Sequence, residues 1–180
     1  VFYRAESNSS RENMMSQLAA IAELKAQEIG RWRHERLGDA LTIRDNTLLS
    51  SQFEQWIGQP LGSSEKQAAE RWLSIFVSNY DYRDAALIDN RGRVVAATTP
   101  NMHIPDEGRS LRDNAAAQEK PVFGNLYALP DGGQALDLVV PIPARDKRQT
   151  IGFVLLRIAP EKVVYPMLQA WPLPSESAEI

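Results

Sequence analysis

The alternation of apolar and polar residues is clearest in the segment Ala85–Thr99, AALIDNRGRVVAATT, which contains two short apolar runs. The polar segment Asp89–Gly92 separates these runs. Turn-forming residues between two apolar runs predict a β-hairpin, with Gly92 in a left-handed backbone conformation that glycine adopts at little cost. The hairpin therefore marks the first two strands of a sheet.

Three later segments also have strand character. The pattern is weakest at Pro121–Tyr127, whereas Ala135–Ile142 (ALDLVVPI) and Ile151–Ile158 (IGFVLLRI) are almost continuously apolar. The polar loop Ala144–Thr150 joins the last two segments, which predicts an antiparallel pair. Strands that are apolar on both faces need cover on both sides of their sheet.

Helical spacing of apolar positions dominates the chain before the hairpin. No proline interrupts the stretch from Ser9 to Ile43, which predicts one amphipathic helix with its N-cap at Ser9 or Ser10. A helix of about 30 residues is about 45 Å long, so a long core helix and a stalk leading out of the domain are equal alternatives. Shorter helices are expected at Asp45–Trp56, from a cap at Ser63 or Ser64 to Tyr80, at Ser110–Gln118 and from Pro160 to Leu168.

The expected elements suggest how the sheet is covered and how the chain is divided. The N-terminal helices are expected to cover one face, and the irregular segment Pro100–Tyr127 the other. A loop-built cover over a sheet is a natural place for a small-molecule pocket. We expect a stalk helix at residues 1–44, an α+β domain at 45–170 and an exit linker at 171–180.

Composition narrows the chemistry. The 180 residues carry a net charge of −3, contain no cysteine, and include two histidines, His34 and His103. A net charge of −3 does not indicate a nucleic-acid partner. The sequence also lacks the histidine and cysteine spacings of metal sites and the glycine-rich or nucleophile motifs of common enzymes. We therefore expect no catalytic residues, no metal and no cofactor.

Polar residues near the expected cover are the candidate ligand contacts, namely Thr98, Thr99, His103, Arg109, Tyr127 and Asp137. Arg109 could supply a guanidinium to a small carboxylate. Its alternative is a surface position at the start of a helix. Asp137 stands between two leucines in an apolar strand, so it either faces solvent or binds something.

The order of these elements resembles the extracytoplasmic Cache (PAS-like, PDC) sensor domains of bacterial transmembrane receptors. The likeness is carried by the hairpin LIDNRGRVVAAT, the strand and turn IGFVLLRIAP, and the C-terminal segment YPMLQAWPLPSESAE, and it covers nearly the whole chain. Specifically, the chain looks like the membrane-distal module of a double-Cache receptor of the histidine kinase or diguanylate cyclase type.

The resemblance implies an α+β fold with a long N-terminal helix before a PAS-like five-stranded antiparallel sheet that is covered on both faces. It also implies a non-catalytic, periplasmic ligand-sensing domain of an inner-membrane receptor, flanked by membrane spans and signalling as a homodimer. The ligand would be a small molecule, with a carboxylate or an amino acid as candidates. The alternative is a cytoplasmic PAS-type protein-interaction module without a small ligand.

Overall fold

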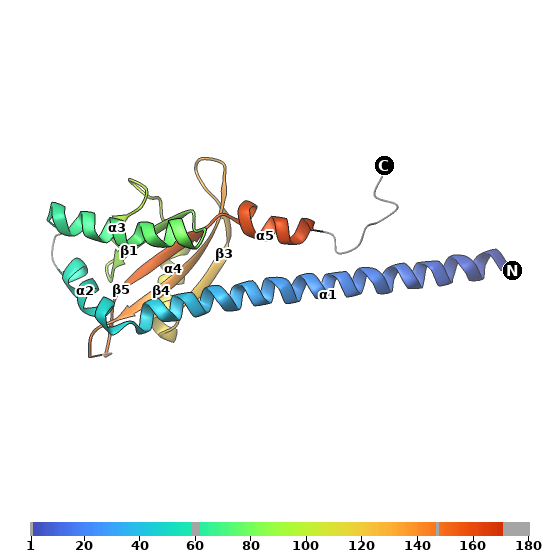
Figure 1. Ribbon diagram of the computed structural model, residues 1–180, viewed down its shortest axis with the longest axis horizontal. Coiled ribbons are helices and arrows are strands. Elements are labelled where there is room, and N and C mark those ends of the chain that lie inside the picture. Colours follow the sequence, from blue (N-terminus) through green and yellow to red (C-terminus); the bar gives the residue numbers. More distant parts are fainter. Residues whose placement is uncertain (1, 59–61, 147, 171–180) are drawn as a thin grey trace. The chain divides into compact units, whose positions relative to one another are not determined.

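The computed structural model describes residues 2–58, 62–146 and 148–170, and Figure 1 shows how their helices and strands are arranged. The helices are α1 (Phe2–Asp45), α2 (Thr47–Gly58), α3 (Ser63–Asn79), α4 (Glu107–Gln118) and α5 (Pro160–Gln169). The strands are β1 (Asp84–Asp89), β2 (Val94–Ala97), β3 (Val122–Ala128), β4 (Gln134–Pro143) and β5 (Thr150–Ile158). The expected α+β class is confirmed.

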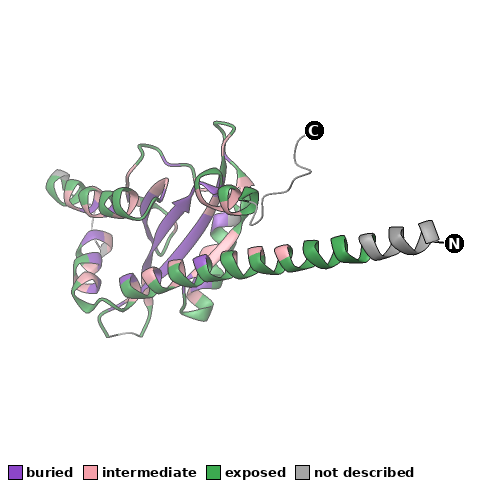
Figure 2. Cartoon of the chain, turned by 45° about the vertical axis from the view of Figure 1, so that its right-hand side comes forward, coloured by how far each residue is buried: buried purple, intermediate pink, exposed green. Residues whose placement is uncertain are grey.

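Within the described residues the strands form one five-stranded sheet in the order β2-β1-β5-β4-β3, and every neighbouring pair is antiparallel. The expected antiparallel pairing of the last two strands is confirmed by the register Val140↔Val154 between β4 and β5. β5 also pairs with β1, through Ile88↔Phe153. The last strand of the sequence therefore lies at the centre of the sheet, where its apolar residues are buried on both sides (Figure 2).

Both faces of the sheet are covered, as the apolar strands predict. On one face α4 packs over a core that contains Ile88, Val139 and Leu155. On the other face Ile57 of α2 lies against Gly152 of β5. α3 packs beside α2 through an edge-on contact between the rings of Phe53 and Trp72, whose centroids are 5.0 Å apart. The face that the segment Pro100–Tyr127 was expected to cover is thus covered by α4 together with the loop before it, and not by a loop alone.

The β1–β2 turn is built as the sequence predicts. Gly92 has φ +85°, and its N–H donates to the Asp89 carbonyl oxygen at 3.0 Å. The Asp89 carboxylate accepts hydrogen bonds from the N–H groups of Arg91 and Arg93, at 2.9 and 2.8 Å, and from Arg93 Nε at 2.7 Å. Burial alone would raise the pKa of Asp89, but these donors outweigh it and hold the pKa below its usual value.

The predicted start of the long helix is wrong. α1 begins at Phe2 and runs through Ser9 and Ser10 without a break, so neither serine is its N-cap. Serine is tolerated inside a helix at only a small cost in propensity, and the surrounding helix formers are sufficient to continue the turn pattern.

The starts of the next two helices also differ from the prediction. The side-chain oxygen of Asn46 accepts hydrogen bonds from the N–H groups of Leu48 and Leu49, at 3.1 and 3.2 Å, so α2 starts two residues later than expected. α3 follows an N-cap at Gly62, and the expected caps Ser63 and Ser64 lie inside the helix.

Two compact units share the chain. One comprises Val1–Glu35 and Glu161–Ile180, and the other comprises Arg36–Pro160, which contains the whole sheet and α4. The division at residues 44/45 and 170/171 stays a prediction, and the expected linker 171–180 lies outside the described residues. No helix among the described residues is both long enough and apolar enough to cross a bilayer.

Candidate ligand-binding site

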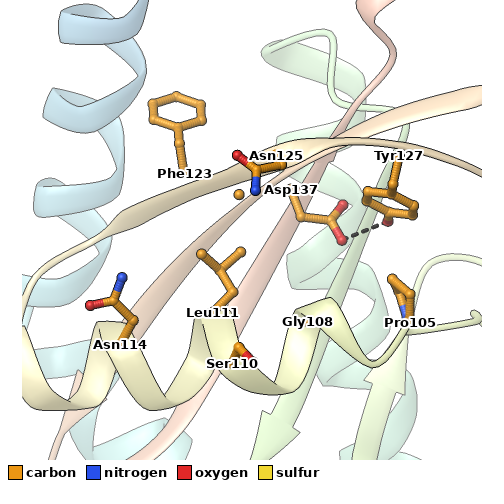
Figure 3. Close-up of a pocket in the computed structure, with 10 residues that line it drawn as sticks. Pro105, Gly108, Ser110, Leu111, Asn114, Phe123, Asn125, Tyr127 and Asp137 are labelled. Carbon is orange, nitrogen blue, oxygen red and sulfur yellow. Dashed lines mark hydrogen bonds between the residues drawn. The ribbon is translucent and has the colours of Figure 1, made fainter.

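A pocket of about 360 Å³ opens between α4 and the strands β3 and β4. Pockets of this size are typical of small-molecule sites. Side chains from three elements surround it (Figure 3): Ser110, Leu111 and Asn114 from α4, Asn125 and Tyr127 from β3, and Asp137 from β4.

The local backbone of β3 helps to form the pocket. Its register with β4 shifts between Phe123 and Leu126, which is a bulge that redirects the side chains of the strand. Gly124 lies in this bulge, and a Cβ at that position would be 3.0 Å from Leu111 of α4 and 3.4 Å from the carbonyl oxygen of Asp137. The absence of a side chain at Gly124 therefore permits α4 to approach the sheet closely.

A buried ion pair lies at one side of the pocket. Arg157 Nε donates to Asp137 Oδ1 at 2.9 Å, and Arg157 Nη2 donates to Asp137 Oδ2 at 3.1 Å. Both side chains are 3% exposed, and the register between β4 and β5 places the two residues opposite each other. A two-point pairing of this kind satisfies both charges without solvent.

Two further contacts complete the network. The Tyr127 hydroxyl donates to Asp137 Oδ2 at 2.7 Å, drawn as the dashed line in Figure 3, and the Arg157 guanidinium lies 5.6 Å from the centre of the Tyr127 ring. Arg157 Nη2 also donates to the His103 carbonyl oxygen at 3.0 Å, which ties the loop before α4 to β5. The network thus connects β3, β4, β5 and that loop.

The network perturbs the ionisation of its members. Burial raises the pKa of Tyr127 well above its ordinary value, and the charge of Asp137 and the hydrogen bond to it act in the same direction. Burial alone would lower the pKa of Arg157, but the hydrogen bonds and the charge of Asp137 outweigh it and raise the pKa. At neutral pH the phenol is therefore a hydrogen-bond donor, and the guanidinium stays charged.

The structure brings three of the six candidate residues to this region. Tyr127 and Asp137 line the pocket, and His103 contributes its backbone carbonyl to Arg157 while its side chain is exposed. Asp137 is buried, with a protein partner in Arg157.

The other three candidates lie elsewhere. Thr98 Oγ1 accepts from the Ala85 N–H at 2.9 Å and donates to the Ala85 carbonyl oxygen at 3.3 Å, and the Thr99 hydroxyl is hydrogen bonded to Asp84, so both threonines fasten the hairpin. The Arg109 side chain is 73% exposed, and its ion-pair partner at 3.5 Å, Asp106, is 90% exposed.

Sequence reasoning missed Arg157 and the uncharged lining residues Ser110, Asn114 and Asn125. A signal for Arg157 was present, because it is the one charged residue in the strand IGFVLLRI, just as Asp137 is the one charged residue in ALDLVVPI. When two buried strands are expected to pair and each contains a single charge of opposite sign, the two charged residues are expected to form an ion pair. The uncharged residues carried no comparable signal.

No family model and no curated protein matches the chain. Solved structures do. The sensor domain of the Vibrio cholerae histidine kinase DctB has a TM-score of 0.61 and 14% identity, with 88% of this chain and 60% of that one covered. The ligand-binding domain of the Campylobacter jejuni chemoreceptor Tlp3, solved with L-norvaline, has a TM-score of 0.64 and 10% identity, with 89% and 64% covered.

A third solved structure, the ligand-binding domain of the Pseudomonas aeruginosa PAO1 amino acid chemoreceptor PctC with GABA, has a TM-score of 0.57 and 17% identity, with 86% of this chain and 64% of that one covered. The chain has the fold of Cache/PDC sensor domains. The fold expected from the hairpin and the final strand is therefore confirmed. The chain spans 60–64% of the length of these three solved structures.

Proposed function

We propose that the chain is a non-catalytic sensor domain of a bacterial transmembrane receptor, exposed in the periplasm, and that the pocket between α4 and β3–β4 holds its small-molecule ligand. The observation that carries the proposal is that a chain with the sensor-domain fold has a pocket of ligand size between its sheet and α4. The output module, a histidine kinase or a diguanylate cyclase, and the flanking membrane spans belong to the parent protein.

The position of the ion pair supports a signalling role. Asp137 lines the pocket, and its partner Arg157 is followed after two residues by Pro160, where α5 begins. A ligand that alters the contacts of Asp137 therefore acts on the strand that leads out of the domain. Such a change has to favour one of two conformations to be transmitted.

A homodimer is part of the same proposal. α1 carries exposed apolar side chains at Met14, Met15, Leu18 and Leu24, with exposed fractions between 46% and 66%. Met14, Met15 and Leu18 lie within about 100° of one another around the helix, and Leu24 lies on the adjoining face, so this part of α1 suits a helix–helix contact between two receptor chains. Light scattering of the isolated chain and of a Leu18→Glu/Leu24→Glu variant tests it.

The ligand proposal is tested by thermal unfolding of the full chain in a screen of small polar molecules. A ligand at a concentration of 100 Kd stabilises by about 2.7 kcal/mol, which for a chain of this size raises Tm by about 5–10 °C. Ser110→Trp fills the pocket and should abolish the shift. Arg109→Trp changes the neighbouring exposed position and should leave it. A shift that survives Ser110→Trp would move the ligand out of this pocket.

The cellular location is tested separately in the parent gene. A reporter enzyme that is active only after export, fused at the end of the chain, should be active in the proposed topology. An inactive reporter would favour the alternative, a cytoplasmic PAS-type interaction module.

A further inference from the structure

The pocket has an unusual charge inventory for a site that binds amino acids or carboxylates. Among the described residues that line it, Asp137 is the one with a carboxylate, and none is a lysine, an arginine or a histidine. Its carboxylate is held by two points of Arg157, at 2.9 and 3.1 Å, and both side chains are 3% exposed. The pair presents no net charge to a ligand.

Among the described residues that line the pocket, none has a cationic side chain to pair with an anionic ligand. Arg157 lies behind Asp137, and its Nε and Nη2 atoms donate to Asp137 and to the His103 carbonyl oxygen. Arg109 precedes the lining residue Leu111 by two positions, which places the two side chains about 160° apart around α4. A carboxylate would therefore lie beside the carboxylate of Asp137 without a countercharge, and such burial is costly.

The first turn of α4 is a poorer anion site than a helix start usually is. The N–H of Gly108 donates to the Pro105 carbonyl oxygen, and the N–H of Arg109 donates to the Asp106 carbonyl oxygen, both at 2.9 Å. These are two of the four amide groups that could otherwise bind an anion at a helix start. Both are already used within the turn.

A cationic ligand meets the converse difficulty. Asp137 Oδ2 already accepts from Arg157 Nη2 and from the Tyr127 hydroxyl, and Oδ1 accepts from Arg157 Nε. An ammonium group would have to share this carboxylate with a guanidinium of the same sign. The Tyr127 ring has the Arg157 guanidinium 5.6 Å from its centre, so its face is likewise in use by a cation.

The remaining lining groups are uncharged hydrogen-bonding side chains. Ser110, Asn114 and Asn125 each contain a donor and an acceptor, and Leu111 adds an apolar surface. Asn114 Oδ1 accepts from Gln118 Nε2 at 2.6 Å, so the NH₂ group of Asn114 is the part of this side chain that can still donate to a ligand. Hydroxyl and amide groups of a ligand are complementary to this set.

Building on the proposed function, we infer that this pocket binds an uncharged polar molecule that carries hydroxyl or primary amide groups, and that it discriminates against carboxylates and zwitterionic amino acids. The ligand class thus differs from the L-norvaline and GABA named for two of the solved structures with this fold.

The test uses the full chain and probes matched in shape but not in charge. The pairs are propionamide and propionate, glutaramide and glutarate, and benzamide and benzoate, with glycerol, D-ribose and myo-inositol as neutral polyols and L-serine as a zwitterion. Thermal unfolding identifies binders, and calorimetry gives their Kd. We expect a neutral probe to raise Tm, and the acid of its pair or L-serine to bind at least tenfold more weakly.

Two results would overturn the inference, and they differ in what they say of the sensor proposal. A carboxylate or L-serine that binds as tightly as the neutral probes, and whose binding is lost in Ser110→Trp, refutes the ligand class but retains ligand sensing at this pocket. Absence of binding by every probe counts against both.

A charge-switch variant sharpens the test. Asp137→Asn keeps the shape of the side chain but leaves the Arg157 guanidinium without its countercharge, so the acid of a matched pair should gain at least tenfold relative to its amide. An unchanged preference in a folded variant refutes the reasoning. If circular dichroism shows that this variant does not fold, Asn125→Ala replaces it. That variant should weaken the neutral probe at least fivefold without improving the acid, whereas Arg109→Ala, the matched control, should change neither.

Discussion

Replacing Arg157 by methionine should destabilise the fold by about 3–5 kcal/mol at pH 7, which is the range expected when one partner of a buried ion pair is removed. Asp137 and Arg157 are each 3% exposed, so solvent cannot take over the role of the lost guanidinium. Methionine retains the length of the aliphatic stem, so the loss reports the charge more than the packing. The remaining partner of the carboxylate is the Tyr127 hydroxyl.

The cost has an upper limit that depends on pH, because an unpartnered buried carboxylate can take up a proton. Protonating a carboxyl group of ordinary aspartate pKa, about 3.9, costs about 4 kcal/mol at pH 7 and about 1.5 kcal/mol at pH 5. Within this limit, the destabilisation by Arg157→Met should fall from about 3–4 kcal/mol at pH 7 to about 1.5 kcal/mol at pH 5. Urea unfolding of the full chain at pH 7 and pH 5 measures both.

A double replacement separates the ion pair from its surroundings. Asp137→Val combined with Arg157→Met removes both charges, and such pairs can be replaced by apolar residues at little net cost. The double variant should therefore be within about 2 kcal/mol of the unaltered chain, far from the sum of the single losses. Arg148→Met is the control, because Arg148 is 86% exposed in its pair with Asp146 and should change stability by less than about 0.5 kcal/mol. Additive losses, or an Arg157→Met cost that is equal at both pH values, would refute the account.

Two further predictions concern single hydrogen-bonding groups. Asp89→Ala should cost about 2–3 kcal/mol of stability, because Arg91 and Arg93 lose their shared acceptor. Since the folded-state pKa of Asp89 is lowered, the contribution of its carboxylate to stability is present above about pH 4 and is lost as the pH falls below that. Urea unfolding from pH 5 to pH 2 should therefore show a weaker pH dependence in Asp89→Asn than in the unaltered chain. Tyr127→Phe should cost about 1–2 kcal/mol of stability through the lost hydrogen bond to Asp137. Because the folded-state pKa of Tyr127 is raised, the contribution of its hydroxyl to stability is complete below about pH 10 and declines above it. A loss of stability above pH 10 that is as steep in Tyr127→Phe as in the unaltered chain would contradict this assignment.

The strands were predictable because each carries its own evidence. The turn Asp89–Gly92 and the apolar runs beside it fix the hairpin from neighbouring residues alone, and the structure has the same turn with φ +85° at Gly92. Helix ends were less predictable, since several residues near an end can cap it equally well. α2 starts behind the cap Asn46, two residues after the expected Asp45, and α3 is capped by Gly62 where Ser63 or Ser64 was expected.

The site was predictable only where a residue conflicted with its own strand. Asp137 was found because an acid between leucines needs a partner, and Tyr127 because it is a polar residue at the end of the expected cover. Arg109 was chosen by charge, but the helical phase of α4, which starts three residues before the expected Ser110, carries its side chain away from the pocket. Arg157 became relevant through the register between β4 and β5, which is a property of the folded sheet.

The fold of this chain does not determine which ligand it binds. Identities of 10–17% over a shared fold show that the backbone arrangement tolerates replacement of most of its side chains, and a shared fold does not by itself fix the ligand. What a sensor of this fold detects is therefore determined by the charges left unpaired in its pocket. Here the acid of the lining is neutralised from within the sheet by Arg157, so the recognition that remains is that of neutral hydrogen-bonding groups. In a folded Asp137→Asn variant, reversal of that preference would demonstrate that the ion pair sets the ligand class, because the change removes one charge and keeps the shape of the side chain.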